Sequence, residues 1–251
     1  MTENTTSTVE EFLKYQKTAA SDLRYDLAKH NMLMMHNLTR EPKLALDAGC
    51  GNGIMSKWLL GMEYHVTSID SDPAMIDAAG EKLEYWEKLD RCDLHEDNIE
   101  DVIGNYTLII CHHVIEYLKY PPRVFEVFRA SALPDAELSL ITINPASQVI
   151  RSIIFNRNPN QALRRLTDLS YDAKWFGKSQ MYSPQQIIQW AADYRWQLTG
   201  LRGIRCLADY LPMFQSQSIT ADELLELEKA LAPLEPYRSM ARYLQFAFKA
   251  V

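Results

Sequence analysis

The chain has 251 residues, of which 47% are apolar, and its formal net charge is -7 at pH 7. This length suits one α/β domain over residues 1–251, and the apolar content excludes a globally disordered chain. The negative charge argues against a protein that coats nucleic acid without specificity. No apolar run is long enough for a transmembrane helix and the first residues lack a signal-peptide pattern, so we expect a cytoplasmic protein without a membrane partner.

Strands and helices alternate through the first part of the chain. Residues 1–40 predict an N-terminal helical segment, because apolar residues recur every three or four positions between residues 10 and 38. The strands expected after it cover residues 44–46, 64–69, 89–92, 107–111 and 138–143, and two of the helices between them cover residues 54–61 and 73–86. Such alternation implies a parallel sheet with helices on both faces.

Two insertions interrupt this pattern in the second part of the chain. Residues 145–182 are basic and aromatic with no clear strand, and residues 207–236 are mainly helical and acidic. A helix over residues 183–194 and a strand over 197–204 lie between them, and alternation over 242–249 predicts an antiparallel edge strand. We therefore predict a Rossmann-like α/β fold, a mostly parallel seven-stranded sheet, with both insertions over the carboxyl ends of its strands, where ligands bind.

The four cysteines and the charge distribution indicate which kinds of ligand and substrate the protein could bind. The cysteines are widely scattered without any metal-ligand spacing, so we expect reduced, buried thiols and no metal site. Residues 139–205 hold nine basic and three acidic residues, which leaves this stretch at +6 and the remainder at -13. Such a stretch is either a solvated helical face or a docking surface for an anionic substrate.

The sequence Gly-x-Gly-x-Gly over residues 49–53 lies between the first strand and the next helix. Glycine allows a sharp turn and a close approach to a ligand. Asp70 ends the second strand, 19 residues after Gly51, where a carboxylate can accept both hydroxyls of a ribose. Position 54 is Ile, so the dinucleotide pattern is incomplete, and Asp47 suits an ammonium and a sulfonium better than a pyrophosphate.

These features resemble the class I S-adenosylmethionine methyltransferase family over roughly residues 42–145. The resemblance implies the class I methyltransferase fold and S-adenosylmethionine as the cofactor. It also implies that the glycine turn contacts the methionine moiety and that Asp70 holds the ribose. Residues 92–95 match the segment that lines the adenine, and residues 111–117 match the floor beneath the cofactor; His95 and His113 are also read as structural or surface residues.

Shorter stretches are similar to the bacterial tRNA 5-carboxymethoxyuridine methyltransferase family, which esterifies the carboxylate of a modified wobble uridine. They are Leu23-Arg24, residues 112–117, 196–200, 203–205 with 209–211, and 235–237 with 241–243. The similarity implies tRNA as the partner and adds Arg24 and His112 to the cofactor contacts. Two departures are Cys50 and Asn52 in the glycine turn and the loss of a lysine run from the first insertion.

The expected cofactor contacts are Arg24, Asp47, Gly49, Cys50, Gly51, Asp70, Asp93, Leu94, His95 and His112.

A carboxylate acceptor changes which residues the chemistry requires. With an unperturbed pKa near ~4 it is ionised at neutral pH, so no general base and no catalytic residue is expected. A positioned cation must orient it, and the fork of an arginine suits a carboxylate. The expected substrate contacts are Arg205, Arg242, Tyr210, Tyr237, Tyr243 and Asn144, the last of which serves equally well as a turn-stabilising residue before Pro145.

Three functions stay open at this point. The first is the tRNA methyltransferase, the second a class I methyltransferase acting on a small-molecule carboxylate or hydroxyl such as a quinone precursor, and the third a non-catalytic S-adenosylmethionine-binding protein. The basic stretch over residues 139–205 favours the first over the second. The oligomeric state is left open.

Overall fold

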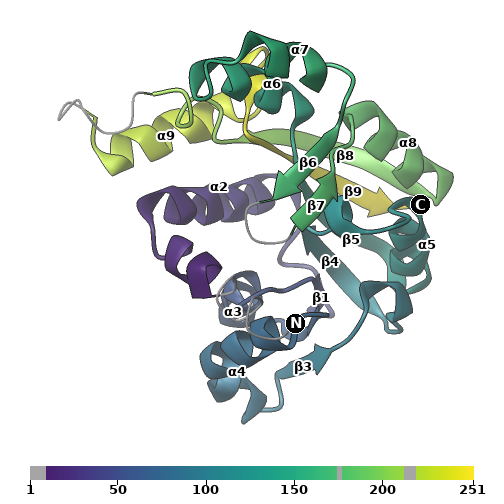
Figure 1. The fold of residues 1–251 in the computed structure, drawn as a ribbon. Helices are drawn as coiled ribbons and strands as arrows, with labels where there is room; N and C mark the ends of the chain where they lie inside the picture. The colour runs from purple at the N-terminus through teal and green to yellow at the C-terminus, as the bar shows by residue number, and fades with distance from the viewer. Residues whose placement is uncertain (1–9, 174–176, 212–218) are drawn as a thin grey trace.

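The computed structural model describes residues 10–173, 177–211 and 219–251. Seven strands form one sheet in the order β3-β2-β1-β4-β5-β9-β8 (Figure 1). Their bounds are β1 Leu44–Ala48, β2 His65–Asp70, β3 Cys92–Glu96, β4 Tyr106–His112, β5 Ala132–Ile143, β8 Trp196–Ile204 and β9 Tyr243–Ala250. Pairing is parallel from β3 through β5, and β9 runs antiparallel to both of its neighbours. The predicted Rossmann-like fold, mostly parallel and with its antiparallel strand at one side of the sheet, is confirmed.

The final strand lies one position inside the edge, and β8 forms the edge itself. In β9, Phe246, Ala247 and Phe248 are all fully buried, so both faces of the strand are covered. In β8 the residues between Trp196 and Gly203 are half-buried or exposed. The alternation in the last strand predicted an edge position, whereas the continuous burial of Phe246, Ala247 and Phe248 is typical of a strand inside the sheet.

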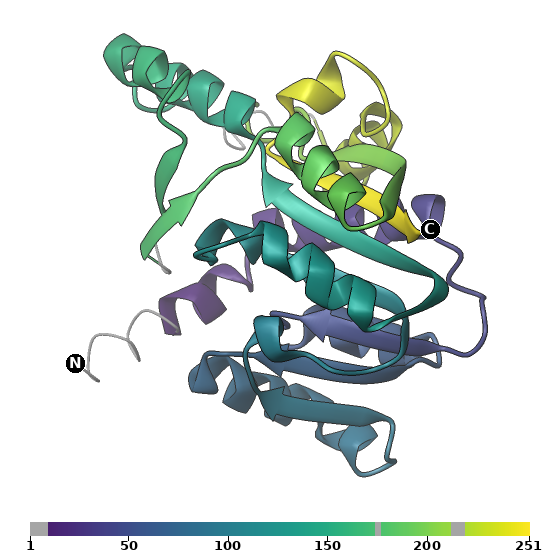
Figure 2. The same cartoon turned by 90° about the vertical axis from the view of Figure 1, so that its right-hand side faces the viewer.

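Helices cover both faces of the sheet (Figures 1 and 2). The helices beside the sheet are α2 Ala19–Met35, α3 Ile54–Gly61, α4 Pro73–Glu87, α5 Pro122–Ala130 and α8 Pro184–Asp193. Met32 of α2, Leu59 of α3 and Leu83 of α4 share one buried cluster with residues of β1 and β2. Phe125 of α5 and Ile187 of α8 belong to a second cluster on the opposite face.

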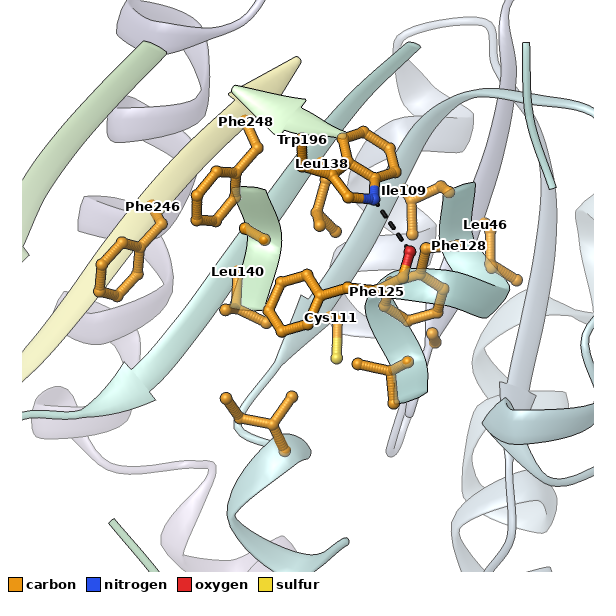
Figure 3. Packing of buried hydrophobic residues seen from close by; sticks show 14 of the residues in the cluster. Leu46, Ile109, Cys111, Phe125, Phe128, Leu138, Leu140, Trp196, Phe246 and Phe248 are labelled. Atoms are coloured by element: carbon orange, nitrogen blue, oxygen red, sulfur yellow. Dashed lines mark hydrogen bonds between the residues drawn. The ribbon is translucent and has the colours of Figure 1, made fainter. Parts of the chain in front are cut away.

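The second cluster is rich in aromatic rings (Figure 3). Phe246 and Phe248 are stacked at a centroid distance of 5.9 Å, and Phe125 meets Phe248 edge to face at 6.3 Å. The indole Nε1 of the fully buried Trp196 donates to the carbonyl oxygen of Phe125 at 3.0 Å, which satisfies its polar atom inside the core. This contact ties the start of β8 to α5.

Three expected boundaries were wrong. The helix expected over residues 10–38 is interrupted at residues 16–18, because the Thr18 side chain accepts from the Ser21 backbone N–H and caps α2 there. The strand expected over residues 89–92 starts at Cys92, since Asp90 has a positive φ of 56° in a turn. Residues 145–182, where no clear strand is expected, contain two short strands, Ser170–Ala173 and Gly177–Gln180.

The first insertion contains two helices, α6 Pro145–Ile154 and α7 Pro159–Arg165, and an antiparallel pair, β6 Ser170–Ala173 with β7 Gly177–Gln180. Lys174, one of the predicted basic residues, lies outside the described residues. The second insertion contains α9 Ala221–Leu231, and α10 Tyr237–Met240 follows directly after it, which agrees with its predicted helical character. No helix in the described ranges is long and apolar enough to cross a bilayer.

Candidate functional site

The glycine turn connects β1 to α3 and is fixed to the end of β2. The backbone N–H groups of Gly49 and Cys50 both donate to the carbonyl oxygen of Ile69 at 2.8 Å. A Cβ at Gly49 would lie 2.3 Å from Val114 Cγ2, in the segment after β4, whereas a Cβ at Gly51 would meet nothing within 4 Å. Both glycines have positive φ. Gly49 is therefore required by packing, and the space beside Gly51 is open to a ligand.

Asp70 lies at the end of β2, next to this open space. Its Oδ2 accepts from the Gly51 backbone N–H at 2.8 Å, and its Oδ1 accepts from the Asp72 N–H at 3.0 Å. Burial raises the pKa of Asp70, and backbone hydrogen bonds from Asp72, Gly51 and Ser71 oppose that shift. A carboxylate oxygen can accept two hydrogen bonds, so each oxygen keeps one acceptor position for a ligand hydroxyl. The geometry fits the two hydroxyls of a ribose.

Asp47 is a buried acid beneath the same turn, with only 3% of its surface exposed. Its Oδ2 accepts from Ser56 Oγ at 2.6 Å, and Ser68 Oγ lies 2.9 Å from Ser56 Oγ. Burial raises the pKa of Asp47 to about 6, and the charge of Asp70 adds to the rise while the bond from Ser56 opposes it. A ligand ammonium nearby would compensate this buried negative charge.

The segment expected to line the adenine lies inside β3 instead of following it. Asp93 faces His65, with Oδ2 at 3.7 Å from Nδ1, Leu94 packs against the cluster on the α4 side, and His95 is exposed. The residue that follows the strand beside the ribose position is Asp97, whose N–H donates to the Asp70 carbonyl at 3.1 Å. The sequence alone missed Asp97, because the strand boundary was placed too early.

Arg24 of α2 is 8% exposed and faces several phenol rings. Its guanidinium carbon lies 4.6 Å from the centre of the Tyr25 ring and 5.9 Å from that of Tyr15. Burial lowers the pKa of Arg24, but the neighbouring Tyr25, Tyr243 and Tyr15 outweigh it and raise the pKa. The charge of Asp47 contributes to the raised pKa of the neighbouring Tyr25, after the larger effects of burial and Arg24.

His112 ends β4 and belongs to a buried polar network. Its Nε2 is 2.9 Å from Ser139 Oγ, to which Gln245 Nε2 also donates at 3.1 Å. Burial, with the charges of His36 and Arg24, lowers the pKa of His112 to about 3. The ring is therefore neutral at physiological pH.

Three arginines converge on one buried carboxylate at the far side of Tyr243. Asp209, whose side chain is 2% exposed, accepts from Arg151 Nη1 at 2.6 Å, forms an ion pair with Arg205 and lies 3.8 Å from Arg242 Nε. We call Arg151, Arg205, Arg242 and Asp209 the arginine cluster. Arg242 Nη1 and Arg205 Nε are buried without a hydrogen-bond partner in the described part of the chain. The cluster therefore has more positive charge than its single acid neutralises.

The backbone brings these residues together from strands that are distant in sequence. The Arg242 N–H at the start of β9 donates to the Arg205 carbonyl after β8 at 3.0 Å, and the Asn144 N–H donates to the Arg242 carbonyl at 3.2 Å. The ends of β5, β8 and β9 are thus joined directly beneath the cluster.

Tyr243 lies between the cluster and Arg24. Its ring meets the His113 ring edge to face at a centroid distance of 4.6 Å, and it is 8% exposed. Burial alone would raise the pKa of Tyr243, but the charges of Arg242, Arg24 and Arg205 lower it to about 8. The lowered pKa reports a strongly positive local potential, because only positive charge favours the phenolate.

The other predicted substrate residues are placed differently. The Asn144 amide caps α6 by accepting from the Ala146 N–H, and its Nδ2 donates to the Ser239 and Ala241 carbonyls at 2.9 and 2.8 Å. The Tyr210 hydroxyl donates to the Met240 carbonyl at 2.6 Å. The Asn144 amide therefore has the turn-stabilising role that the sequence offers as the alternative, and the Tyr210 hydroxyl joins the segment after β8 to α10. Tyr237 is 38% exposed at the start of α10.

The four cysteines are unpaired and buried, as predicted. Burial raises the pKa of Cys92 to about 11, so its thiol stays protonated. Within residues 10–173, 177–211 and 219–251, no group of His, Cys, Asp and Glu side chains could hold a metal ion.

Comparisons with known proteins agree with this arrangement. Residues 15–200 match the family described as "Methyltransferase domain". The chain is 26% identical over 207 residues to the tRNA 5-carboxymethoxyuridine methyltransferase of Escherichia coli K12, covering 79% of this chain and 77% of that protein. It is 24% identical over 203 residues to the ubiquinone biosynthesis O-methyltransferase of Hahella chejuensis, covering 77% and 78%.

Among solved structures, an S-adenosylmethionine dependent methyltransferase from Mesorhizobium loti superposes with a TM-score of 0.64 at 12% identity. The superposition covers 93% of this chain and 99% of that structure. At this level of identity the likeness establishes the fold.

Proposed function

The chain belongs to the methyltransferase domain family, and from that premise we propose that it esterifies the carboxylate of 5-carboxymethoxyuridine at the wobble position of tRNA. The observation that carries this proposal is the arginine cluster. Its three guanidinium groups share one carboxylate, and two buried N–H groups lack a partner. A second carboxylate, supplied by the acceptor, would satisfy both deficits at once.

The methyl donor is S-adenosylmethionine, which when bound supplies a methyl group activated by a sulfonium. The open side of Gly51 leaves room for its methionine moiety, and Asp47 provides a negative charge for its ammonium. Asp70 provides two acceptor positions for the ribose hydroxyls, and the loop that begins at Asp97 would line the base. The residues present therefore fit the donor.

At the acceptor end the residues orient the nucleophile and do not remove a proton from it. Arg205 and Arg242 would bind one carboxylate in a forked geometry, which holds an oxygen in line with the methyl group. The same positive charges lower the pKa of a bound carboxyl group, so it stays ionised. Arg24, whose pKa is raised by Tyr25 and Tyr243, would add a further positive charge near Tyr243.

Support for tRNA as the carrier of this carboxylate comes from the relative in Escherichia coli and from the basic first insertion. Residues 145–167 hold four arginines and no acidic residue. A polyanion would be attracted to such a stretch in an otherwise acidic chain.

Labelling of tRNA tests the proposal. The protein is incubated with methyl-labelled donor and bulk tRNA from cells that lack the methyl ester, and we expect label that mild base removes from the tRNA. The control is Asp70→Ala, which should abolish labelling by weakening donor binding. Donor binding by the wild type without any labelling of tRNA would sink the proposal.

A small-molecule acceptor is the second candidate, because the relative from Hahella chejuensis matches over a similar length. The arginine cluster favours a carboxylate over a hydroxyl in this case too. A hydroxyl acceptor must lose its proton, and burial lowers the pKa of both His112 and His113, which makes each ring a weak base. Labelling of a small carboxylic acid with no labelling of tRNA would favour this candidate.

A further inference from the structure

Helix α6 buries polar residues and exposes apolar ones. Ser147, Gln148 and Ser152 are between 0% and 8% exposed, whereas Ile153 and Phe155 are 47% and 45% exposed. A helix that served only the core of this protein would show the opposite pattern. An apolar tip of this kind marks an interaction surface.

Phe155 differs from the phenylalanines of the core and is paired with a charged residue. The phenyl rings of the core are fully buried, but Phe155, just after α6, is stacked against Arg151, whose guanidinium carbon lies 4.5 Å from the ring centre. Arg151 also donates to Asp209 at 2.6 Å. The ring is therefore held by a side chain that is itself bound within the arginine cluster, and 45% of the surface of Phe155 is exposed.

The surroundings of Phe155 are positive and project from the body of the protein. Arg157, Arg164 and Arg165 follow within α7 and the turn before it, and no acidic residue occurs between residues 145 and 167. Figure 2 shows α6 and α7 extending beyond the sheet at the upper left, away from the C-terminus. An aromatic ring next to arginines in an acid-free stretch is the arrangement on which single-stranded nucleic acid stacks.

We propose that Phe155, backed by Arg151, is a stacking platform for an unpaired base of an RNA loop. Because Arg151 belongs to the arginine cluster, the stacked base would be a neighbour of the nucleotide whose carboxylate the cluster binds. The proposal rests on the proposed function for the identity of that nucleotide, but the platform itself requires only RNA. Arg157 and Arg164 are exposed and would contact its phosphates.

A binding experiment that needs no methyl transfer tests the platform. Fluorescence anisotropy with a labelled anticodon stem-loop RNA compares the wild type with Phe155→Ala, Phe155→Trp and Leu163→Ala. Loss of one stacked base should weaken binding roughly 5- to 150-fold in Phe155→Ala, and tryptophan should restore it. Leu163, 65% exposed on α7, is the matched control: an apolar side chain on the same projection that cannot stack, so its removal should leave affinity unchanged.

The outcomes separate the platform from the proposed function. Equal affinity of the wild type and Phe155→Ala, or no binding of RNA by the wild type, overturns the platform. Sedimentation with vesicles of phosphatidylglycerol and phosphatidylcholine measures binding to lipid. If both alanine variants reduce vesicle binding while RNA affinity is unchanged, the platform is overturned and the surface is identified as one that binds lipid. RNA binding that depends on Phe155, without methylation of hypomodified tRNA, supports the platform and rejects the proposed function.

Discussion

The donor end and the acceptor end of this site differ in which atoms build them and in how far apart those atoms lie in the chain. At the donor end, Asp70 is held by the backbone N–H groups of Gly51 and Asp72, and the turn is held by the Ile69 carbonyl. All of these contacts lie within two adjacent strands and their loops. At the acceptor end, side chains from residues 151–242 meet around Asp209.

The two ends also carry opposite charge. Asp47 and Asp70 make the donor end negative, which suits a ligand with an ammonium and a sulfonium. Three arginines against Asp209 make the acceptor end positive, and the lowered pKa of Tyr243 reflects it. A cationic donor would be attracted to the negative end and an anionic acceptor to the positive end, as the proposed function requires. Substitutions confined to one end test whether donor binding and acceptor binding can be lost separately.

The largest effect is expected from Arg242→Gln. Loss of one partner of a buried charge pair costs about 2–5 kcal/mol, so kcat/KM for the carboxylate acceptor should fall roughly 30- to 5000-fold. Donor affinity, measured by isothermal titration calorimetry, should stay within about threefold of the wild type, because no donor contact is removed.

Arg202→Gln is the matched control for that variant. Arg202 donates to Asn31 Oδ1 at 2.9 Å and to the Lys229 carbonyl at 3.3 Å, away from the arginine cluster. Its loss should lower stability but leave kcat/KM nearly unchanged. If Arg202→Gln and Arg242→Gln reduced kcat/KM equally, or if Arg242→Gln weakened donor binding, the separation of the two ends would be wrong.

A smaller effect, on stability, is expected at the glycine turn. Gly49→Ala should lower the free energy of unfolding by about 3 kcal/mol, because the positive φ and the overlap with Val114 both oppose a Cβ. Gly51→Ala meets no atom and should cost only about 1 kcal/mol from its φ. Urea unfolding measures both, and the added substitution Val114→Ala should recover part of the loss in Gly49→Ala alone. Equal destabilisation by the two alanines would contradict the packing role of Gly49.

The donor end could be predicted from the sequence because its signals are local. A glycine turn after an apolar strand and an acid at the end of the next strand fix their own positions in the fold, and both lie where expected. The boundary of β3 was misplaced, since it depends on the turn at Asp90, which no pattern in the sequence marks. Strands β6 and β7 were missed because they are short and polar and lack alternation.

The acceptor end was only partly predictable, because its contacts are long-range. A resemblance indicated Arg205 and Arg242, but not that Asp209 would also draw in Arg151 from a different insertion. For Asn144 the sequence left a substrate contact and a turn-stabilising role equally open, and its amide caps α6 and donates to carbonyl groups near residue 240. Which polar groups are left free depends on pairings about 100 residues apart, and composition and spacing do not contain that information.

The smallest effect on function is expected from Asp47→Asn, which should raise stability but weaken donor binding. When folding raises the pKa of an acid, the folded state favours the protonated form of that acid. The resulting stabilisation is present below the unfolded pKa and is lost as the pH rises through the folded pKa. For Asp47, with an ordinary pKa of 3.8 and a folded pKa of about 6, the protein without donor loses stability between these values. Asparagine does not ionise and can still accept from Ser56, so the variant should be more stable than the wild type by about 3 kcal/mol at pH 7 and equally stable near pH 4.

The same substitution should weaken donor binding, because the ammonium would lose its buried counter-charge. Thermal unfolding at pH 4 and pH 7 measures the first effect, and calorimetry at pH 7 measures the second, for which we expect roughly a tenfold loss. Asp77→Asn is the control, since Asp77 is exposed on α4 and should change neither the pH dependence nor donor affinity. A less stable Asp47→Asn at pH 7 with unchanged donor affinity would mean that Asp47 serves the fold alone, and the negative end of the site would then consist of Asp70.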